Sequence, residues 1–183
     1  FDEALREMKK AYQLDPMSPN VSNGLARIYH FRRERENALE QVNKTLEIDP
    51  GYAEGHFTKG MIYFGLGEFP NAEVELKRAA ELAGRRPVML GMMGALYAKQ
   101  QRLGEANSIL AELQAPPMTN DKQYAIAMIR IHMGQIDEGF DIMDRLMDEK
   151  YGVLIYMKAQ KDMLPETVGP RYDSLLKRLN FPK

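Results

Sequence analysis

Residues 53–86 read AEGHFTKGMIYFGLGEFPNAEVELKRAAELAGRR, and the small and aromatic residues in this stretch recur along the chain. Gly60, Tyr63 and Ala72 each have counterparts thirty-four residues away. The alanine series is Ala4, Ala38, Ala72 and Ala106, the tyrosine series is Tyr29, Tyr63 and Tyr97, and the small residues before the tyrosines are Ala26, Gly60 and Gly94. Series in phase at one period indicate a tandem array, and a period of about 34 residues is that of a helix-turn-helix unit.

Counting from Pro19, Ala53, Pro87 and Asn120 gives four stretches with a shared pattern. The residues that carry it are Leu25, Ala26, Tyr29, Ala38, Val42 and Pro50, then Gly60, Tyr63, Gly67, Ala72, Leu76 and Ala79. They continue with Met93, Gly94, Tyr97, Ala106, Leu110 and Leu113, then Ile126, Ala127, Gly134, Gly139, Met143 and Leu146. This pattern resembles that of tetratricopeptide repeat proteins. The chain departs from it in having no tryptophan: Ser22, His56, Leu90 and Gln123 take that place, and Arg130 replaces the fourth tyrosine.

The resemblance implies an all-α fold, a right-handed superhelical solenoid of antiparallel helix pairs closed by a C-terminal capping helix. We expect repeats at 17–52, 53–86, 87–118 and a degenerate one at 119–150, with the cap at 151–183. Residues 1–16 match the second helix of a repeat whose first helix is missing, because Ala4, Met8 and Ala11 precede Ala38, Val42 and Thr45 by one period. We therefore expect a truncated repeat with an exposed apolar face at this end.

The last segment, residues 170–182, resembles the ending that closes repeat arrays at the C-terminus of bacterial signalling proteins. Tyr172, Leu175, Leu176 and Leu179 in this segment form one apolar stripe at helical spacing. Winged-helix regulators, nucleotide cyclases and serine/threonine kinases are the classes with such endings. The resemblance therefore implies the C-terminal part of a larger bacterial regulatory protein.

The amino-acid composition limits the kinds of partner and the location that we expect for the chain. The 25 basic and 26 acidic residues nearly cancel, which argues against a nucleic-acid footprint over a whole face. The sequence contains no cysteine and therefore no disulfide or zinc-thiolate site. No run of about 18 apolar residues exists, so we predict no membrane span. We expect a cytoplasmic location, with any targeting signal in the missing N-terminal part.

The sequence presents no recognisable catalytic constellation. Its three histidines, His30, His56 and His132, lie in different repeats, with none four residues from another. That spacing forms no zinc-ligand cluster, so we predict no metal site, no cofactor and no enzymatic activity. The dense arginines at Arg32, Arg33 and Arg35 alternate with glutamates and are typical of a solvated turn.

The resemblance also implies which residues line the concave face of the array. The predicted partner-binding groove comprises Asn20, Asn23, Arg27, His30, Phe31, Phe57, Met61, Phe64, Met92, Lys99, Tyr124 and Met128. The carboxylate clamp of co-chaperone adaptors would fall on Asn23, Arg27, Thr58, Val88 and Met92. Only one of these residues is a cation, so we expect an apolar stretch of a partner, or another part of the same polypeptide, to lie in the groove.

We therefore predict a non-enzymatic scaffold that binds a peptide segment or a neighbouring domain in an apolar concave groove. Two alternatives stay open. The array could be a homodimerisation module, or it could regulate an enzyme, a kinase or cyclase, whose catalytic domain lies outside this sequence.

Overall fold

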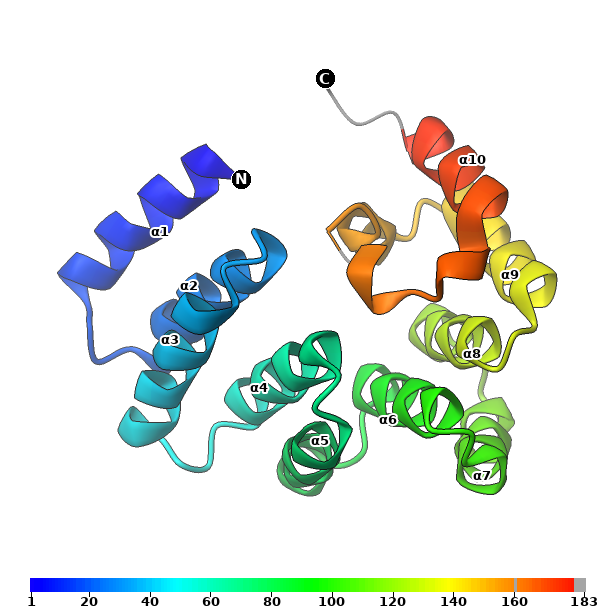
Figure 1. The fold of residues 1–183 in the computed structure, drawn as a ribbon, viewed down its shortest axis with the longest axis horizontal. Helices are drawn as coiled ribbons and strands as arrows, with labels where there is room; N and C mark the ends of the chain where they lie inside the picture. The colour runs from blue at the N-terminus through cyan, green and yellow to red at the C-terminus, as the bar shows by residue number, and fades with distance from the viewer. Residues whose placement is uncertain (160, 180–183) are drawn as a thin grey trace. The chain divides into compact units, whose positions relative to one another are not determined.

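The computed structural model describes residues 1–159 and 161–179, which are helical with no strand among them (Figure 1). The α-helices are α1 (Asp2–Leu14), α2 (Pro19–Phe31), α3 (Arg35–Ile48), α4 (Ala53–Leu66), α5 (Phe69–Ala83), α6 (Pro87–Lys99), α7 (Leu103–Gln114), α8 (Asn120–His132), α9 (Ile136–Asp148) and α10 (Gly169–Leu179). Three short 3-10 helices, η1 (Gly152–Tyr156), η2 (Lys161–Met163) and η3 (Glu166–Val168), precede α10. The predicted all-α class is confirmed.

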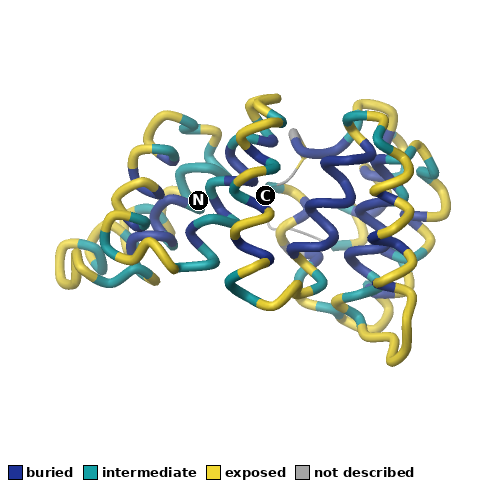
Figure 2. Tube along the Cα trace, turned by 90° about the horizontal axis from the view of Figure 1, so that it is seen from below, coloured by how far each residue is buried: buried dark blue, intermediate teal, exposed yellow. Residues whose placement is uncertain are grey.

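The chain forms two compact units, Phe1–Gly84 with α1 to α5 and Arg85–Lys183 with α6 to α10. Helices pair within each unit: α2 with α3 and α4 with α5 in the first, α6 with α7 and α8 with α9 in the second. The first helices of these pairs begin at Pro19, Ala53, Pro87 and Asn120, the positions from which the sequence repeat was counted. Buried and exposed residues alternate along most helices, as expected for elements that bury one side (Figure 2).

The turn inside each pair has one residue in the left-handed conformation, at Arg33, Gly67, Gln101 and Gly134. The following amide N–H donates to the carbonyl at the tyrosine position of the repeat, as in Glu68 N to Tyr63 O at 2.9 Å. This bond satisfies a carbonyl at the end of the first helix. Gly67 and Gly134 adopt the conformation without a steric penalty, whereas Arg33 and Gln101 adopt it with a Cβ atom present.

A buried polar network replaces the missing aromatic residue in the first repeat. Ser22 is fully buried, and its Oγ accepts from Gln41 Nε2 and Thr45 Oγ1, each at 2.8 Å. The Thr45 hydroxyl also lies 3.1 Å from the Gln41 carbonyl oxygen. Hydrogen bonds between α2 and α3 therefore hold the position that an apolar ring occupies in the family pattern.

Small residues of the repeat allow the paired helices to approach each other closely. A Cβ atom placed on Gly60 of α4 would lie 2.7 Å from Leu76 Cγ of α5, closer than carbon atoms pack. Ala38, Ala72 and Ala106 are fully buried, whereas Ala4 in α1 is exposed. The α1 helix contains no buried residue; its last residue, Leu14, is 87% exposed, and Met17, just after the helix, is 69% exposed. The apolar exposure predicted at this end is present.

The C-terminal segment, residues 151–168, packs onto the fourth repeat. Its buried side chains Leu154, Met157, Leu164 and Val168 share one core with Tyr124, Met128, Ile131, Phe140, Met143 and Leu146. Helix α10 adds the buried Tyr172 and Leu175 to this core, with Leu176 and Leu179 partly buried against it. The apolar stripe predicted for the capping helix therefore faces the repeat; residues 180–182 of that prediction lie outside the described part.

Charged side chains fasten α10 to α9. Arg171 lies 3.0 Å from Asp137, 2.7 Å from Asp141 and 3.2 Å from Asp144. Arg178 pairs with Asp144 and with Asp148. The carboxylates recur at helical spacing along one side of α9, so two arginines of the capping helix meet an acidic stripe.

Candidate partner-binding site

The first helices α2 and α4 lie side by side in the N-terminal unit and form the α2–α4 face. We define this face by Asn20, Asn23, Arg27, His30 and Phe31 of α2 with Phe57, Met61 and Phe64 of α4, all from the predicted groove. Tyr52, the residue before α4, donates from Oη to Asn20 Oδ1 at 2.5 Å. At the other end a Cβ on Gly65 would lie 3.7 Å from Cε1 of His30. The two helices are thus in register at both ends.

Arg27 is the charged centre of the α2–α4 face. Its guanidinium lies 5.9 Å from the Phe31 ring centroid, within reach of a cation–π contact. Burial raises the pKa of the Tyr52 phenol, the Glu54 carboxylate raises it further, and the Arg27 charge acts in the opposite sense. Tyr52 therefore stays protonated and keeps its hydrogen bond to Asn20 across the physiological pH range.

The aromatic residues of this face differ in exposure. Phe31 and Phe57 are partly exposed, whereas Met61 and Phe64 are buried. The Phe64 ring packs against that of Phe69 at a centroid distance of 5.9 Å. Of the apolar groove predicted on α4, Phe57 is therefore the side chain that a partner can reach without local rearrangement.

Two buried polar side chains on the same helices each have one oxygen atom without a hydrogen-bond partner in the described part of the chain. Asn23 of α2 is 4% exposed and Thr58 of α4 is 1% exposed. The two unpaired atoms are Asn23 Oδ1 and Thr58 Oγ1. A buried polar atom left unpaired costs roughly 1–3 kcal/mol, so this face retains unused hydrogen-bonding capacity.

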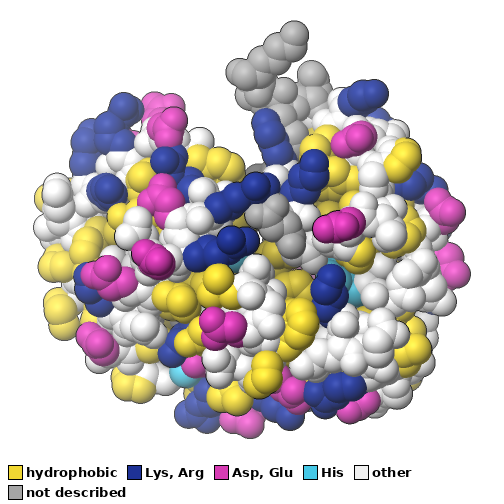
Figure 3. Space-filling view, in the orientation of Figure 1, with side chains coloured by type: hydrophobic (Ala, Val, Ile, Leu, Met, Phe, Trp, Pro, Cys, Tyr) yellow, Lys and Arg dark blue, Asp and Glu magenta, His cyan; other side chains and the backbone are white. Residues whose placement is uncertain are grey.

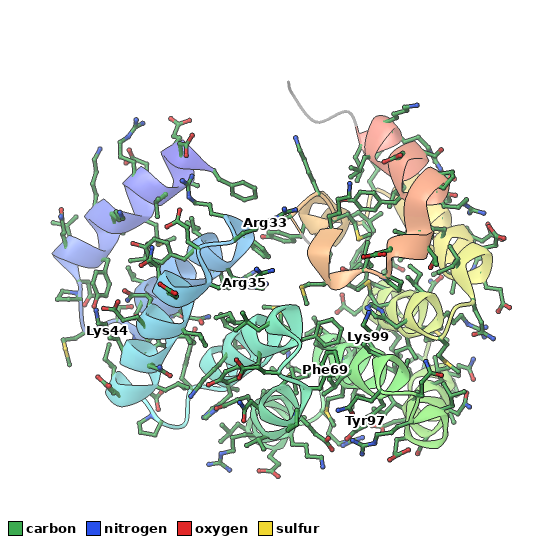
Figure 4. The ribbon with its side chains drawn as sticks, viewed as in Figure 1. Arg33, Arg35, Lys44, Phe69, Tyr97 and Lys99 are labelled. Atoms are coloured by element: carbon green, nitrogen blue, oxygen red, sulfur yellow. The ribbon has the colours of Figure 1, made fainter. Side chains whose placement is uncertain are left out.

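Basic side chains border the face at the end of α2. Arg33 and Arg35 extend from the same side of the α2–α3 turn, whereas Lys44 lies on the other side of α3 (Figure 4). Arg35 Nη2 lies 3.5 Å from the Gly65 carbonyl oxygen, where it complements the C-terminal end of α4. Over the rest of the surface in view, acidic and basic side chains are interspersed (Figure 3).

The predicted groove residues of the C-terminal unit have different environments. Lys99 is exposed at the end of α6, and Met92 is buried within that helix. Tyr124 and Met128 are each 6% exposed, in the core shared with the C-terminal segment. The Tyr124 hydroxyl lies 4.0 Å from Met157 Sδ. The sequence placed these two side chains on an open concave face; in the structure the chain's own C-terminal segment covers them.

Tyr52 and Thr58 lie beside residues of this face but are not among the predicted groove residues. Tyr52 precedes the first helical position of its repeat, so a count of helix positions passes over it. Thr58 entered only as a failed match to the carboxylate clamp. Thr58 follows Phe57 directly in α4. A hydroxyl residue next to a predicted groove residue was the sequence signal that could have identified it.

Within the described ranges 1–159 and 161–179, no three His, Asp or Glu side chains group as they would around a metal ion. None of the helices described there is both long enough and apolar enough to cross a membrane.

The fold has counterparts among solved structures. The TPR protein TTC0263 of Thermus thermophilus has a TM-score of 0.63 at 24% identity, with coverage of 96% of this chain and 90% of that one. YrrB, described as a TPR protein with an unusual peptide-binding site, has a TM-score of 0.56 at 16% identity, covering 93% of this chain and 89% of that one. Identities this low show a common fold.

Sequence relatives agree with the fold. A TPR repeat-containing protein of Methanocaldococcus jannaschii, MJ1428, is 25% identical over 153 residues, which cover 81% of this chain and 26% of that protein. The heat shock protein STI1 of Saccharomyces cerevisiae is 28% identical over 120 residues, 64% of this chain and 20% of STI1. The chain thus spans about a quarter or less of these relatives. The Tetratricopeptide repeat family model matches residues 53–85, within the stretch from which the period was derived. The helix pairs have the same phase, and the family match, the relatives and the solved structures together support a tetratricopeptide repeat protein.

Proposed function

We propose that the chain is a non-enzymatic scaffold that binds a peptide segment or a neighbouring domain on the α2–α4 face. The observation that carries this proposal is the presence of two partly exposed aromatic side chains, Phe31 and Phe57, on the adjacent helices α2 and α4. An apolar side chain of the partner would cover the two rings, whereas the buried Asn23 oxygen would accept a hydrogen bond from the partner only after a local rearrangement.

This binding surface is smaller than the groove predicted from sequence. The C-terminal segment covers Tyr124 and Met128, so these residues bind a partner only if that segment moves. Met61 and Phe64 are buried, and polar substitutions there would disturb folding rather than test binding. Phe57 is the informative position.

The test is a selection of random twelve-residue peptides on the immobilised chain, followed by fluorescence polarisation with the selected peptide. Phe57→Ala should weaken binding by about tenfold or more, because a partly buried aromatic contact contributes above 1 kcal/mol. Val74→Ala on α5 is the matched control, since Val74 is an exposed apolar residue away from this face. Equal affinities of the two variants, or no selected peptide at all, would reject the proposal.

A second candidate function is homodimerisation through α1. Phe1, Leu14 and Met17 are exposed, and no side chain of α1 is buried. An apolar face of this kind is a candidate contact for a second copy. Light scattering over a concentration series tests this: Leu14→Ser should abolish any dimer, and a monomer at every concentration removes the candidate.

We also propose that the array belongs to a larger cytoplasmic bacterial regulator. The support is the resemblance of residues 170–182 to the endings of such proteins. A kinase, cyclase or winged-helix pattern in the upstream reading frame would support the context, and a lipoprotein signal there would contradict it.

A further inference from the structure

His132 has an unusual position between α8 and the C-terminal segment. Its side chain is 7% exposed. Nδ1 lies 2.8 Å from the carbonyl oxygen of Met128, one turn earlier in α8. Nε2 lies 2.7 Å from the carbonyl oxygen of Met163, which ends η2. The second contact ties the C-terminal segment to the fourth repeat.

Both of these partners are hydrogen-bond acceptors. A carbonyl oxygen accepts only, and a neutral imidazole carries one N–H, so the neutral ring donates to one of the two oxygens. A protonated ring would donate to both. Protonation also places a positive charge where almost no water reaches it.

Protonation of His132 would add a hydrogen bond but would also bury a positive charge, and the cost of the buried charge is the larger of the two effects. Desolvation lowers the pKa of His132 below its ordinary value, more strongly than the contacts with Met128 and Met163 raise it. Lys99, at the end of α6, lowers it further by charge repulsion. The added hydrogen bond of the protonated ring therefore does not compensate for the buried charge.

We propose that His132 is an acid-sensitive clasp, whose protonation loosens the C-terminal segment from the fourth repeat and uncovers Tyr124 and Met128. In the detached state the ring is in water and takes up a proton near pH 6.5. In the docked state it does so only at lower pH. The detached state thus binds more protons in this window, and docking is fully stable above about pH 6.5 and weakens below it.

The segment that opens is suited to local detachment. Its described residues include three short 3-10 helices, whose hydrogen bonding is poorer than that of an α-helix. The buried Leu154, Met157, Leu164 and Val168 still favour docking. Acid therefore raises the fraction of molecules in which the segment is open, without unfolding the repeat beneath it.

Amide hydrogen exchange of residues 151–168 in the full chain tests the clasp, with rates corrected for the intrinsic effect of pH. Between pH 7.5 and 5.5 the protection should fall by roughly threefold or more, and His132→Gln should remove this fall. His30→Gln and His56→Gln are matched controls that change the other two histidines and should keep the response.

The histidine ring signals give a second readout that needs no variant to fold. By nuclear magnetic resonance, His132 should titrate below pH 6.5 and take up its proton as the segment opens. Titration at or above pH 6.5, protection that rises on acidification, or the same fall in His132→Gln would each overturn the proposal. None of these readouts depends on whether the α2–α4 face binds a peptide.

Discussion

Replacing Ser22 by alanine isolates the polar network that stands in for the missing aromatic residue. The change removes the Oγ atom to which Gln41 and Thr45 donate at 2.8 Å. Thr45 retains the Gln41 carbonyl as an acceptor at 3.1 Å, but the Gln41 side-chain amide loses its interhelical partner while buried. One unpaired buried donor costs about 1–3 kcal/mol, and the better helix propensity of alanine returns about 0.5 kcal/mol. We expect a net loss of about 1.5 kcal/mol.

Urea unfolding followed by circular dichroism at several protein concentrations measures this loss. Ser108→Ala on α7 is the matched control, because Ser108 is exposed and should gain a few tenths of a kcal/mol. Adding Gln41→Leu to Ser22→Ala should recover at least half of the lost free energy, since both polar partners are then gone. The reasoning is refuted if Ser22→Ala matches the control, or if the double variant is less stable than the single one.

Two further predictions concern the C-terminal unit. Gly91→Ala should lower stability by about 2 kcal/mol, because its Cβ would lie 2.8 Å from Ala125 Cβ and 2.9 Å from Ala125 Cα. Gly104→Ala is the control, with no atom within 4 Å, and should stabilise; thermal unfolding separates them, and equal shifts would contradict the packing argument. Arg171→Gln should cost about 1 kcal/mol at low salt and little in 1 M NaCl, because its three carboxylate partners lie at the surface. Arg145→Gln on exposed α9 surface is its control, and a loss that is independent of salt would argue against an ionic role.

The helices followed from the sequence because the repeat supplies several agreeing signals. Small residues, tyrosines and prolines at one period determine where each helix begins and which side it buries. The left-handed residues at Arg33 and Gln101 carry no such signal, since neither is glycine. Their conformation accompanies a hydrogen bond that recurs in each turn: Glu34 N donates to Tyr29 O and Arg102 N donates to Tyr97 O, as Glu68 N donates to Tyr63 O beside Gly67.

The candidate site was harder to predict than the fold. Family register named Asn20, Arg27 and Phe57, and the structure places all three on adjacent first helices of one unit. The position of a residue in the repeat does not determine whether its side chain is exposed to solvent. Exposure also depends on contacts with segments that are distant in sequence. Tyr124 illustrates this: its neighbour Met157 lies thirty-three residues further along, outside any repeat.

The Ser22 network also shows how a degenerate repeat retains its geometry. A family pattern records which side chain usually fills a position, and three hydrogen-bonding groups fill it here. Substitution to the family residue is therefore unfavourable unless Gln41 and Thr45 change as well, because an indole cannot accept their hydrogen bonds.

The burial of helix α6 limits how far the repeats of this array can be exchanged for one another. Ten of its residues, Met89 to Ala98, are buried, whereas α2 buries four. Repeat proteins lengthen and recombine when each unit is interchangeable with its neighbours. A duplicate of the third repeat inserted elsewhere would expose this largely apolar helix. A copy of the first repeat in its place would bury Arg27 and His30, which would fall at the buried positions of Ala95 and Ala98. The repeats share a period of thirty-four residues, but the composition of α6 opposes the exchange of one unit for another.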